Sequence, residues 1–96
     1  MNKIVVEARL QSEDDFLADC VKELYKLQEE DEKAVGETNH TNGVGFNKAD
    51  SVFLSRIARS LQKVGSTIPK FQLPEVRRRM TKYAGQLSGI LPEYDT

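Results

Sequence analysis

Between positions 13 and 34 the apolar residues recur at intervals of three and four, the spacing of one face of an α-helix. These residues are Phe16, Leu17, Cys20, Val21, Leu24 and Leu27. Ser12 precedes them as an N-cap, and Asp15 takes the acidic position of a capping box three residues later. The pattern predicts an amphipathic helix over residues 13–34. Its apolar stripe is also spaced to pair with a second copy across a two-fold axis.

Residues 3–10 show a different pattern, in which apolar and polar side chains alternate. The apolar members are Ile4, Val6, Ala8 and Leu10. A period of two predicts a short β-strand, with Val5 as the exception. Because a lone strand is not stable, it would have to pair with another segment or another chain. The alternative is that residues 3–10 open the first helix.

A break over residues 36–47, rich in Gly, Asn and Thr, separates the first helix from a second one. The second helix is predicted over residues 48–64, with Asn47 as its N-cap and Gly65 after its end. Its apolar positions are Ala49, Val52, Phe53, Ile57, Leu61 and Val64.

A third helix is predicted over residues 75–90, because Pro74 suits a first helical turn and Pro92 forbids a longer helix. Its inward face is Val76, Met80, Tyr83, Leu87 and Ile90. Gly85 and Gly89 weaken a helix, so we expect them to allow close packing of a neighbour. The fold class is mainly α: a three-helix domain with one short N-terminal strand.

The length of 96 residues indicates a single domain, 1–96. Its parts are an acidic segment 1–35, a loop 36–47 and a basic helical pair 48–91. No stretch is apolar enough to span a membrane or to act as a signal peptide, which predicts a cytoplasmic protein with no membrane partner. With one cysteine, Cys20, and one histidine, His40, we expect no disulfide, no metal site and no cofactor.

Charge is separated along the chain. Residues 1–37 carry 11 acidic and 5 basic side chains, a net charge of −6. Residues 38–92 carry 2 acidic and 9 basic ones, a net charge of +7, and residues 93–96 add −2. The near-neutral total therefore conceals a basic half that is suited to phosphate.

Most of the cations of the basic half share helix faces opposite the apolar positions. The proposed phosphate contacts are Arg56, Arg59 and Lys63 on the second helix, and Arg78, Lys82 and Gln86 on the third. Arg77 and Arg79 flank the second set. Arginine suits phosphate because its planar guanidinium donates two parallel hydrogen bonds. The alternatives are that these cations complement the acidic helix or a partner, or are ordinary solvated side chains.

The loop before the second helix adds two candidate contacts, Asn42 and Lys48. Glycines ahead of a helix N-terminus expose backbone N–H groups that attract anions. The loop lacks the spacing of a P-loop, and its other interpretation is a turn and cap with Phe46 inserted as a hydrophobic staple. Catalysis has little support: His40 has no Cys partner nearby, and Cys20 lies on an apolar face. We expect no enzyme.

Two segments carry a resemblance to a known group of proteins. They are NGVGFN at 42–47 with Asp50 after it, and KYAGQL at 82–87. The pair resembles an N-G-V-G-F…K-Y-x-x-Q-L segment of phage- and plasmid-borne proteins that often accompanies helicase-like DNA-processing regions. The likeness covers residues 42–90, and it departs from the pattern at Ile68-Pro69-Lys70-Phe71. It implies a mobile-element origin, a DNA context, and recognition by Asn42, Gly43, Gly45, Phe46, Asp50, Lys82, Tyr83 and Gln86.

The sequence thus predicts a small accessory nucleic-acid-binding protein of a phage or mobile element, with DNA as its partner and the two basic helices as its contact surface. The alternative is a protein–protein interaction module, either a homodimer or an inhibitor of a host enzyme. In that case the acidic first helix would be the contact surface, facing a basic protein partner.

Overall fold

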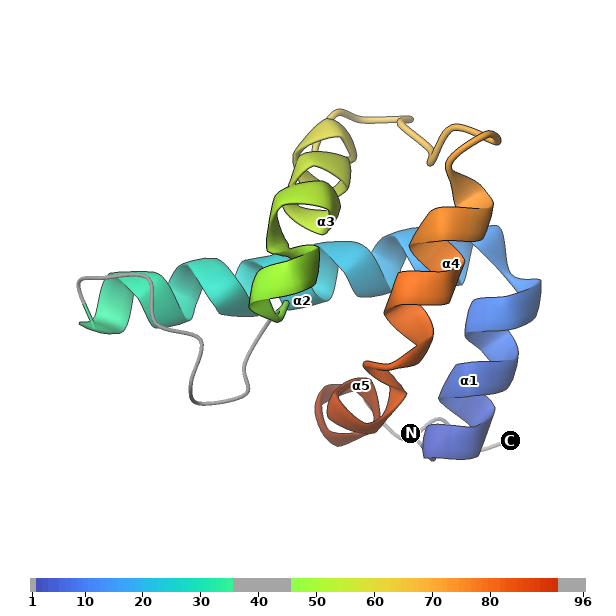
Figure 1. Ribbon diagram of the computed structural model, residues 1–96, viewed down its shortest axis with the longest axis horizontal. Helices are drawn as coiled ribbons and strands as arrows, with labels where there is room; N and C mark the ends of the chain where they lie inside the picture. The colour runs from blue at the N-terminus through green and yellow to red at the C-terminus, as the bar shows by residue number, and fades with distance from the viewer. Residues whose placement is uncertain (1, 36–45, 92–96) are drawn as a thin grey trace.

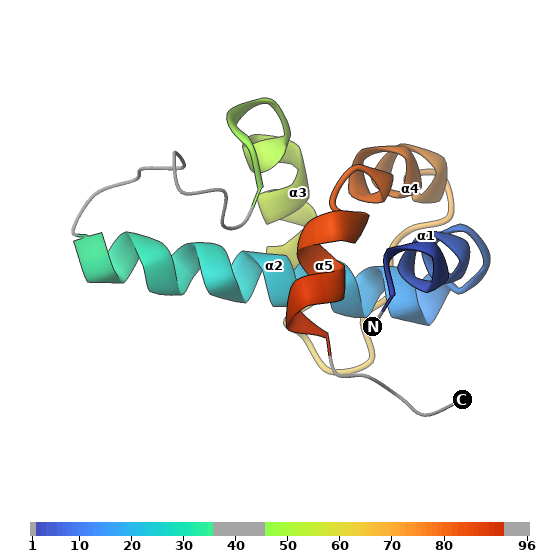
Figure 2. The same ribbon diagram turned by 90° about the horizontal axis from the view of Figure 1, so that it is seen from below.

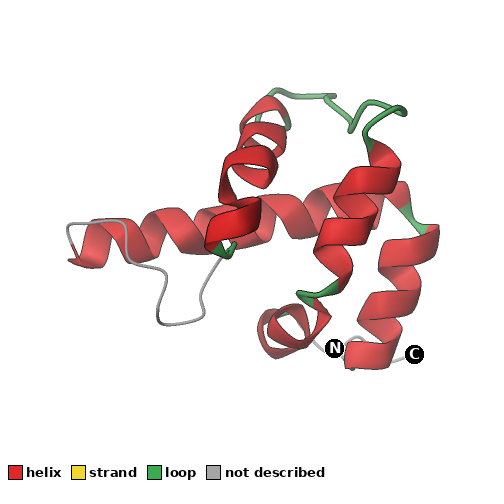
Figure 3. Ribbon diagram, viewed as in Figure 1, coloured by secondary structure: helices red, strands yellow, loops and turns green. Residues whose placement is uncertain are grey.

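The computed structural model describes residues 2–35 and 46–91, which form five helices (Figure 1). They are α1 (Lys3–Ser12), α2 (Asp14–Val35), α3 (Lys48–Ser60), α4 (Leu73–Thr81) and α5 (Ala84–Ile90). The described segments contain helices and loops and no strand (Figure 3). The mainly-α prediction is confirmed, whereas the three-helix count and the N-terminal strand are wrong.

The predicted strand is the helix α1. Its N-cap is Asn2, whose side-chain oxygen accepts a hydrogen bond from the backbone N–H of Ile4 at 2.7 Å. Val6 and Leu10, four residues apart, are its buried side chains, a spacing that fits a helix as well as alternation does. The alternative, that these residues open the first helix, is close to the structure, but the helix is interrupted between α1 and α2.

The break lies at Glu13, which has extended backbone angles. Its N–H closes α1 by donating to the carbonyl of Arg9 at 2.8 Å. Ser12 is therefore the last residue of α1 and not the N-cap of α2, and its hydroxyl donates to the carbonyl of Ala8. Asp14 and Asp15 occupy the first turn of α2, where the helix dipole favours carboxylates.

The predicted cap of α3 is confirmed. The side chain of Asn47 accepts a hydrogen bond from the N–H of Asp50 at 3.0 Å. α3 is shorter than expected, because the helix stops at Ser60 and Leu61 caps it. Gly65 follows later, in a turn with φ of +80° that favours glycine.

The predicted third helix is two helices. α4 has Pro74 in its first turn, as expected, and ends at Thr81. Tyr83 then makes a tighter turn, its N–H donating to the carbonyl of Met80 at 2.9 Å, and α5 leaves in a new direction (Figure 1). Gly85 and Gly89 lie on α5, and a Cβ built on either would meet nothing within 4 Å. The expectation that they allow close packing is wrong.

All five helices contribute to one apolar core. α2 crosses the molecule and packs against α1, α3 and α4, while α1 also packs against α4 and α5. Leu17, Cys20 and Leu24 of α2 are buried in this core. They are therefore not available as a stripe that pairs with a second copy. Figure 2 shows α3 and α4 on the same side of α2.

Candidate nucleic-acid interface

α3 carries a basic outer face made of Lys48, Arg56, Arg59 and, just beyond its end, Lys63, and we call this set the α3 basic face. All four side chains are exposed. None forms an ion pair with another residue in the described ranges. The single carboxylate of α3 is Asp50, and it is buried on the opposite side. The face therefore presents positive charge that no carboxylate among the described side chains offsets.

The predicted cations of α4 are exposed but already have partners. Arg78 donates to Glu75 one helical turn away and keeps 68% of its side chain exposed. Lys82 donates to Asp50 at 2.8 Å, and 48% of its side chain remains exposed. The Arg78–Glu75 pair is exposed and contributes little, so a phosphate competes with it at small cost. Asp50 is buried, so Lys82 is held more firmly by its partner.

A buried carboxylate ties α3 to the end of α4. Asp50, with 3% of its side chain exposed, accepts hydrogen bonds from Arg79 at 3.0 Å, from Lys82 at 2.8 Å and from the hydroxyl of Tyr83 at 2.6 Å. The same hydroxyl accepts a hydrogen bond from the backbone N–H of Asn47 at 2.9 Å. These five residues, Asn47, Asp50, Arg79, Lys82 and Tyr83, form the Asp50 cluster.

The protonation states in the cluster follow from these contacts. Burial raises the pKa of Asp50, but the hydrogen bonds from Lys82 and Tyr83, with help from Arg79, outweigh burial and hold the pKa below its ordinary value of 3.8. Burial, followed by the hydrogen bond to Asp50, raises the pKa of Tyr83. At neutral pH Asp50 is therefore ionised and accepts hydrogen bonds only, while Tyr83 keeps its proton and donates it to Asp50.

Arg79 is a structural residue in this arrangement. It also donates to Glu75 at 2.6 Å, and its guanidinium lies 4.8 Å from the centre of the Phe53 ring on α3. The sequence alone places it merely beside the interface, since its partner Asp50 lies 29 residues away along the chain.

Arg77 supports the alternative in which basic residues complement the acidic helix. Its guanidinium donates to the carbonyl of Leu10 at 2.7 Å and to the carboxylate of Asp14, the first residue of α2. α1, α2 and α4 meet at this point. The cations of the α3 basic face take no part in such pairing with the described carboxylates.

Three predicted phosphate contacts remain, Gln86, Asn42 and Lys48. Gln86 is half-buried on α5, beyond the turn at Tyr83, so it does not continue a stripe of α4. Asn42 lies outside the described residues. Lys48 is exposed in the first turn of α3, as expected.

The segments that carry the resemblance meet in space. Phe46 is fully buried, and its ring packs edge-to-face on Tyr83 with 6.0 Å between ring centres. Its backbone N–H donates to Gln28 of α2 at 3.2 Å. Phe46, Asp50 and Tyr83 thus hold the start of α3 in place, and all three are buried. Lys82, by contrast, is exposed to solvent. Gly43 and Gly45 lie outside the described residues.

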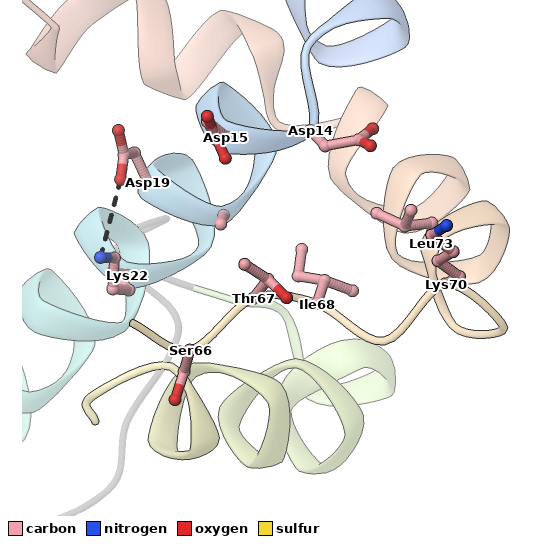
Figure 4. Close-up of a pocket in the computed structure, with 10 residues that line it drawn as sticks. Asp14, Asp15, Asp19, Lys22, Ser66, Thr67, Ile68, Lys70 and Leu73 are labelled. Carbon is pink, nitrogen blue, oxygen red and sulfur yellow. Dashed lines mark ion pairs between the residues drawn. The ribbon is translucent and has the colours of Figure 1, made fainter. Parts of the chain in front are cut away.

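An acidic cleft of about 480 Å³ lies between α2 and the connector that joins α3 to α4 (Figure 4). Its α2 wall holds Asp14, Asp15 and Asp19, and the last of these pairs with Lys22 at 3.6 Å. Thr67 and Ile68 form part of the facing wall (Figure 4). Asp14 also pairs with Arg77, and Lys70 lines the cleft as well, so cations offset part of this acidic charge.

The described residues contain little that suits catalysis. Burial raises the pKa of the Cys20 thiol to about 12, so it stays protonated and unreactive at neutral pH. No three His, Cys, Asp or Glu side chains in the described ranges are grouped to hold a metal ion. None of the helices there has the length and apolar content needed to cross a membrane. His40 lies outside the described residues.

Comparison of the chain with protein families, with characterised proteins and with solved structures finds no match to any of them.

Proposed function

We propose that this protein is a small accessory nucleic-acid-binding protein that holds phosphates on the outer faces of α3 and α4. One observation carries the proposal: Lys48, Arg56, Arg59 and Lys63 are exposed together, with no carboxylate exposed on α3. Ordinary solvated helix faces mix charges of both signs, and this one does not.

Positive charge of this kind suits a polyanion. Arginines bind phosphate oxygens through two parallel donors, and each neutralised phosphate releases counterions. Arg78 and Lys82 extend the surface onto α4, and their present carboxylate partners hold them near it. The acidic α2, on the other side of the molecule, limits non-specific binding by repelling phosphate.

DNA is the nucleic acid we favour, because the segments at 42–47 and 82–87 resemble those that accompany DNA-processing regions of phage and plasmid proteins. The Asp50 cluster supports this proposal indirectly. It fixes the start of α3 against α4 and so keeps the two basic surfaces in a constant relation, which is what a repeating phosphate chain requires.

Binding of labelled DNA and RNA oligomers, measured by fluorescence anisotropy over a salt series, tests the proposal. The double variant R56A/R59A is compared with K3A/K26A, which removes the same charge from exposed positions on α1 and α2. We expect the first variant alone to weaken binding. It should also reduce the slope of log K against log salt by about 0.7 to 0.9 for each phosphate that the variant no longer neutralises.

Two results would contradict the proposal. One is no binding by the wild-type protein even at low salt. The other is equal weakening by R56A/R59A and K3A/K26A, which would mean that only the net charge matters. Both variants change exposed side chains without ion pairs to the described residues, so their melting temperatures should match that of the wild type.

A protein–protein module is the second candidate, and an apolar surface on α1 favours it. Ile4 and Val5 are 75% and 46% exposed, on the side of α1 opposite the core. A homodimer could cover these side chains, and the acidic face of α2 would suit a basic protein partner. Sedimentation at high concentration separates the cases, since a monomer there would exclude the homodimer.

A further inference from the structure

Phe71 is a large apolar side chain that the fold leaves in solvent. It is 83% exposed, whereas the other aromatic side chains in the described ranges are buried or half-buried. The turn that carries it is ordered: the N–H groups of Gln72 and Leu73 both donate to the carbonyl of Pro69, at 2.9 and 3.2 Å. The backbone at Phe71 is therefore held by hydrogen bonds, and the ring extends from it into solvent.

Cations lie on both sides of Phe71 in the sequence. Lys70 precedes it, is exposed, and lines the cleft that also holds Asp14, Asp15 and Asp19. Arg78 on α4 and Lys82 just after α4 are exposed as well, paired with Glu75 and Asp50 respectively. The exposed ring thus belongs to a stretch of chain that carries three exposed cations.

An isolated aromatic ring next to cations suits a nucleobase more than another protein. Protein interfaces bury contiguous apolar patches, whereas the exposed apolar residues near Phe71 in this connector are the small Pro69 and Val64. Proteins that bind single strands combine a basic surface with aromatic rings on which bases stack. In a duplex the base faces are already stacked on each other, so an external ring has no access to them.

We propose that Phe71 stacks on a base and that the ligand of the α3–α4 surface is a single-stranded nucleic acid. This inference rests on the proposed function and adds the strand type and the residue that selects it. The α3 basic face and Arg78 would hold the phosphates, and Phe71 would hold one unstacked base.

The chain has no tryptophan, which allows a direct test. In the variant F71W the new indole is the sole one, and stacking on a base quenches its fluorescence. The full-length variant is titrated with an unstructured oligothymidine of about 16 nucleotides and with its duplex. We expect quenching that saturates with the single strand and is reversed by salt, and little quenching with the duplex.

Substitutions complete the test. F71A should weaken single-strand binding roughly 5- to 100-fold and leave duplex binding nearly unchanged. F71L keeps the apolar bulk without the ring and should behave like F71A, while the control V64A should bind like the wild type. Because Phe71 and Val64 are exposed, thermal melting should show that all variants remain folded.

The outcomes are distinguishable. If F71A binds single strands as the wild type does, or if the duplex is preferred, the stacking role is wrong while the proposed function stands. If the wild-type protein binds no nucleic acid, both proposals are wrong. Binding of F71W to anionic lipid vesicles in place of oligomers would likewise overturn both and identify Phe71 as a membrane contact.

Discussion

Removal of the carboxylate at position 50 should destabilise the protein more than any exposed substitution. In Asp50→Ala, Arg79, Lys82 and Tyr83 all lose their shared acceptor, and the site is almost closed to water. Breaking a buried ion pair by removing one partner costs about 3 to 5 kcal/mol. Lys82 is half-exposed and regains water, so we place the cost at the lower end, at about 3 kcal/mol.

That decrease in stability is measurable by thermal and urea unfolding. For a domain of this size, about 3 kcal/mol lowers the melting temperature by roughly 12 to 24 °C. Asp50→Asn keeps the volume and part of the hydrogen bonding and should be less destabilised. Tyr83→Phe, which removes the hydroxyl between Asp50 and the N–H of Asn47, should cost about 1 to 2 kcal/mol.

The pH dependence of the free energy of unfolding gives an independent measure of what Asp50 contributes to stability. The folded-state pKa of Asp50 is lowered, so its stabilising effect is complete above the ordinary value of 3.8 and is lost as the pH falls through the folded value. The stability difference between the wild type and Asp50→Asn should therefore be largest near neutral pH and shrink below about pH 4.

The matched control is Glu75→Gln, which removes a carboxylate paired with two arginines at the surface. Surface ion pairs contribute little, so its melting temperature should stay close to that of the wild type. The reasoning is refuted if Asp50→Ala melts within a few degrees of Glu75→Gln, or if the stability difference between the wild type and Asp50→Asn does not depend on pH.

Four further predictions concern local structure. Gly85→Ala and Gly89→Ala should each stabilise the protein by about 0.5 to 1 kcal/mol in urea unfolding, because an added Cβ meets nothing and favours the helix. Gly65→Ala should instead destabilise by about 1 to 2 kcal/mol, since its φ is +80°. Asn47→Ala should cost about 1 kcal/mol through removal of the α3 cap, measured by the same method. Cys20, with its raised pKa and burial, should react with iodoacetamide only in denaturant, as mass spectrometry would show.

Helical periodicity predicts most of the fold because it is a local signal. It locates α2 and α3 to within a few residues, and the local preferences of asparagine and proline identify Asn47 and Pro74 at helix starts. At residues 3–10 it fails, because two buried side chains four apart also satisfy an alternating pattern. The turn at Tyr83 could not be predicted, since its side chain bonds to Asp50, 33 residues earlier.

In the interface too, local patterns predict some features, whereas contacts between distant residues determine others. The exposure of Arg56, Arg59 and Lys63 follows from their positions opposite the apolar residues of α3. The hydrogen bond from Lys82 to Asp50 does not follow from the sequence pattern, because the two residues lie 32 positions apart. Phe71 lies between helices, where no periodicity marks it. An aromatic residue in a connector, with a lysine beside it, is the signal that the sequence offers for this position.

α1 packs against α4 and α5, which lie far from it along the chain. Gln11 and Thr81, joined by a hydrogen bond of 2.8 Å, are 70 residues apart, so the fold depends on closing a long loop. Small helical proteins with mostly local contacts fold fastest, and this one should be slower than its helix content suggests. Val6 and Leu10 therefore stay incompletely covered until α4 and α5 pack against α1, so the partly folded chain exposes apolar surface.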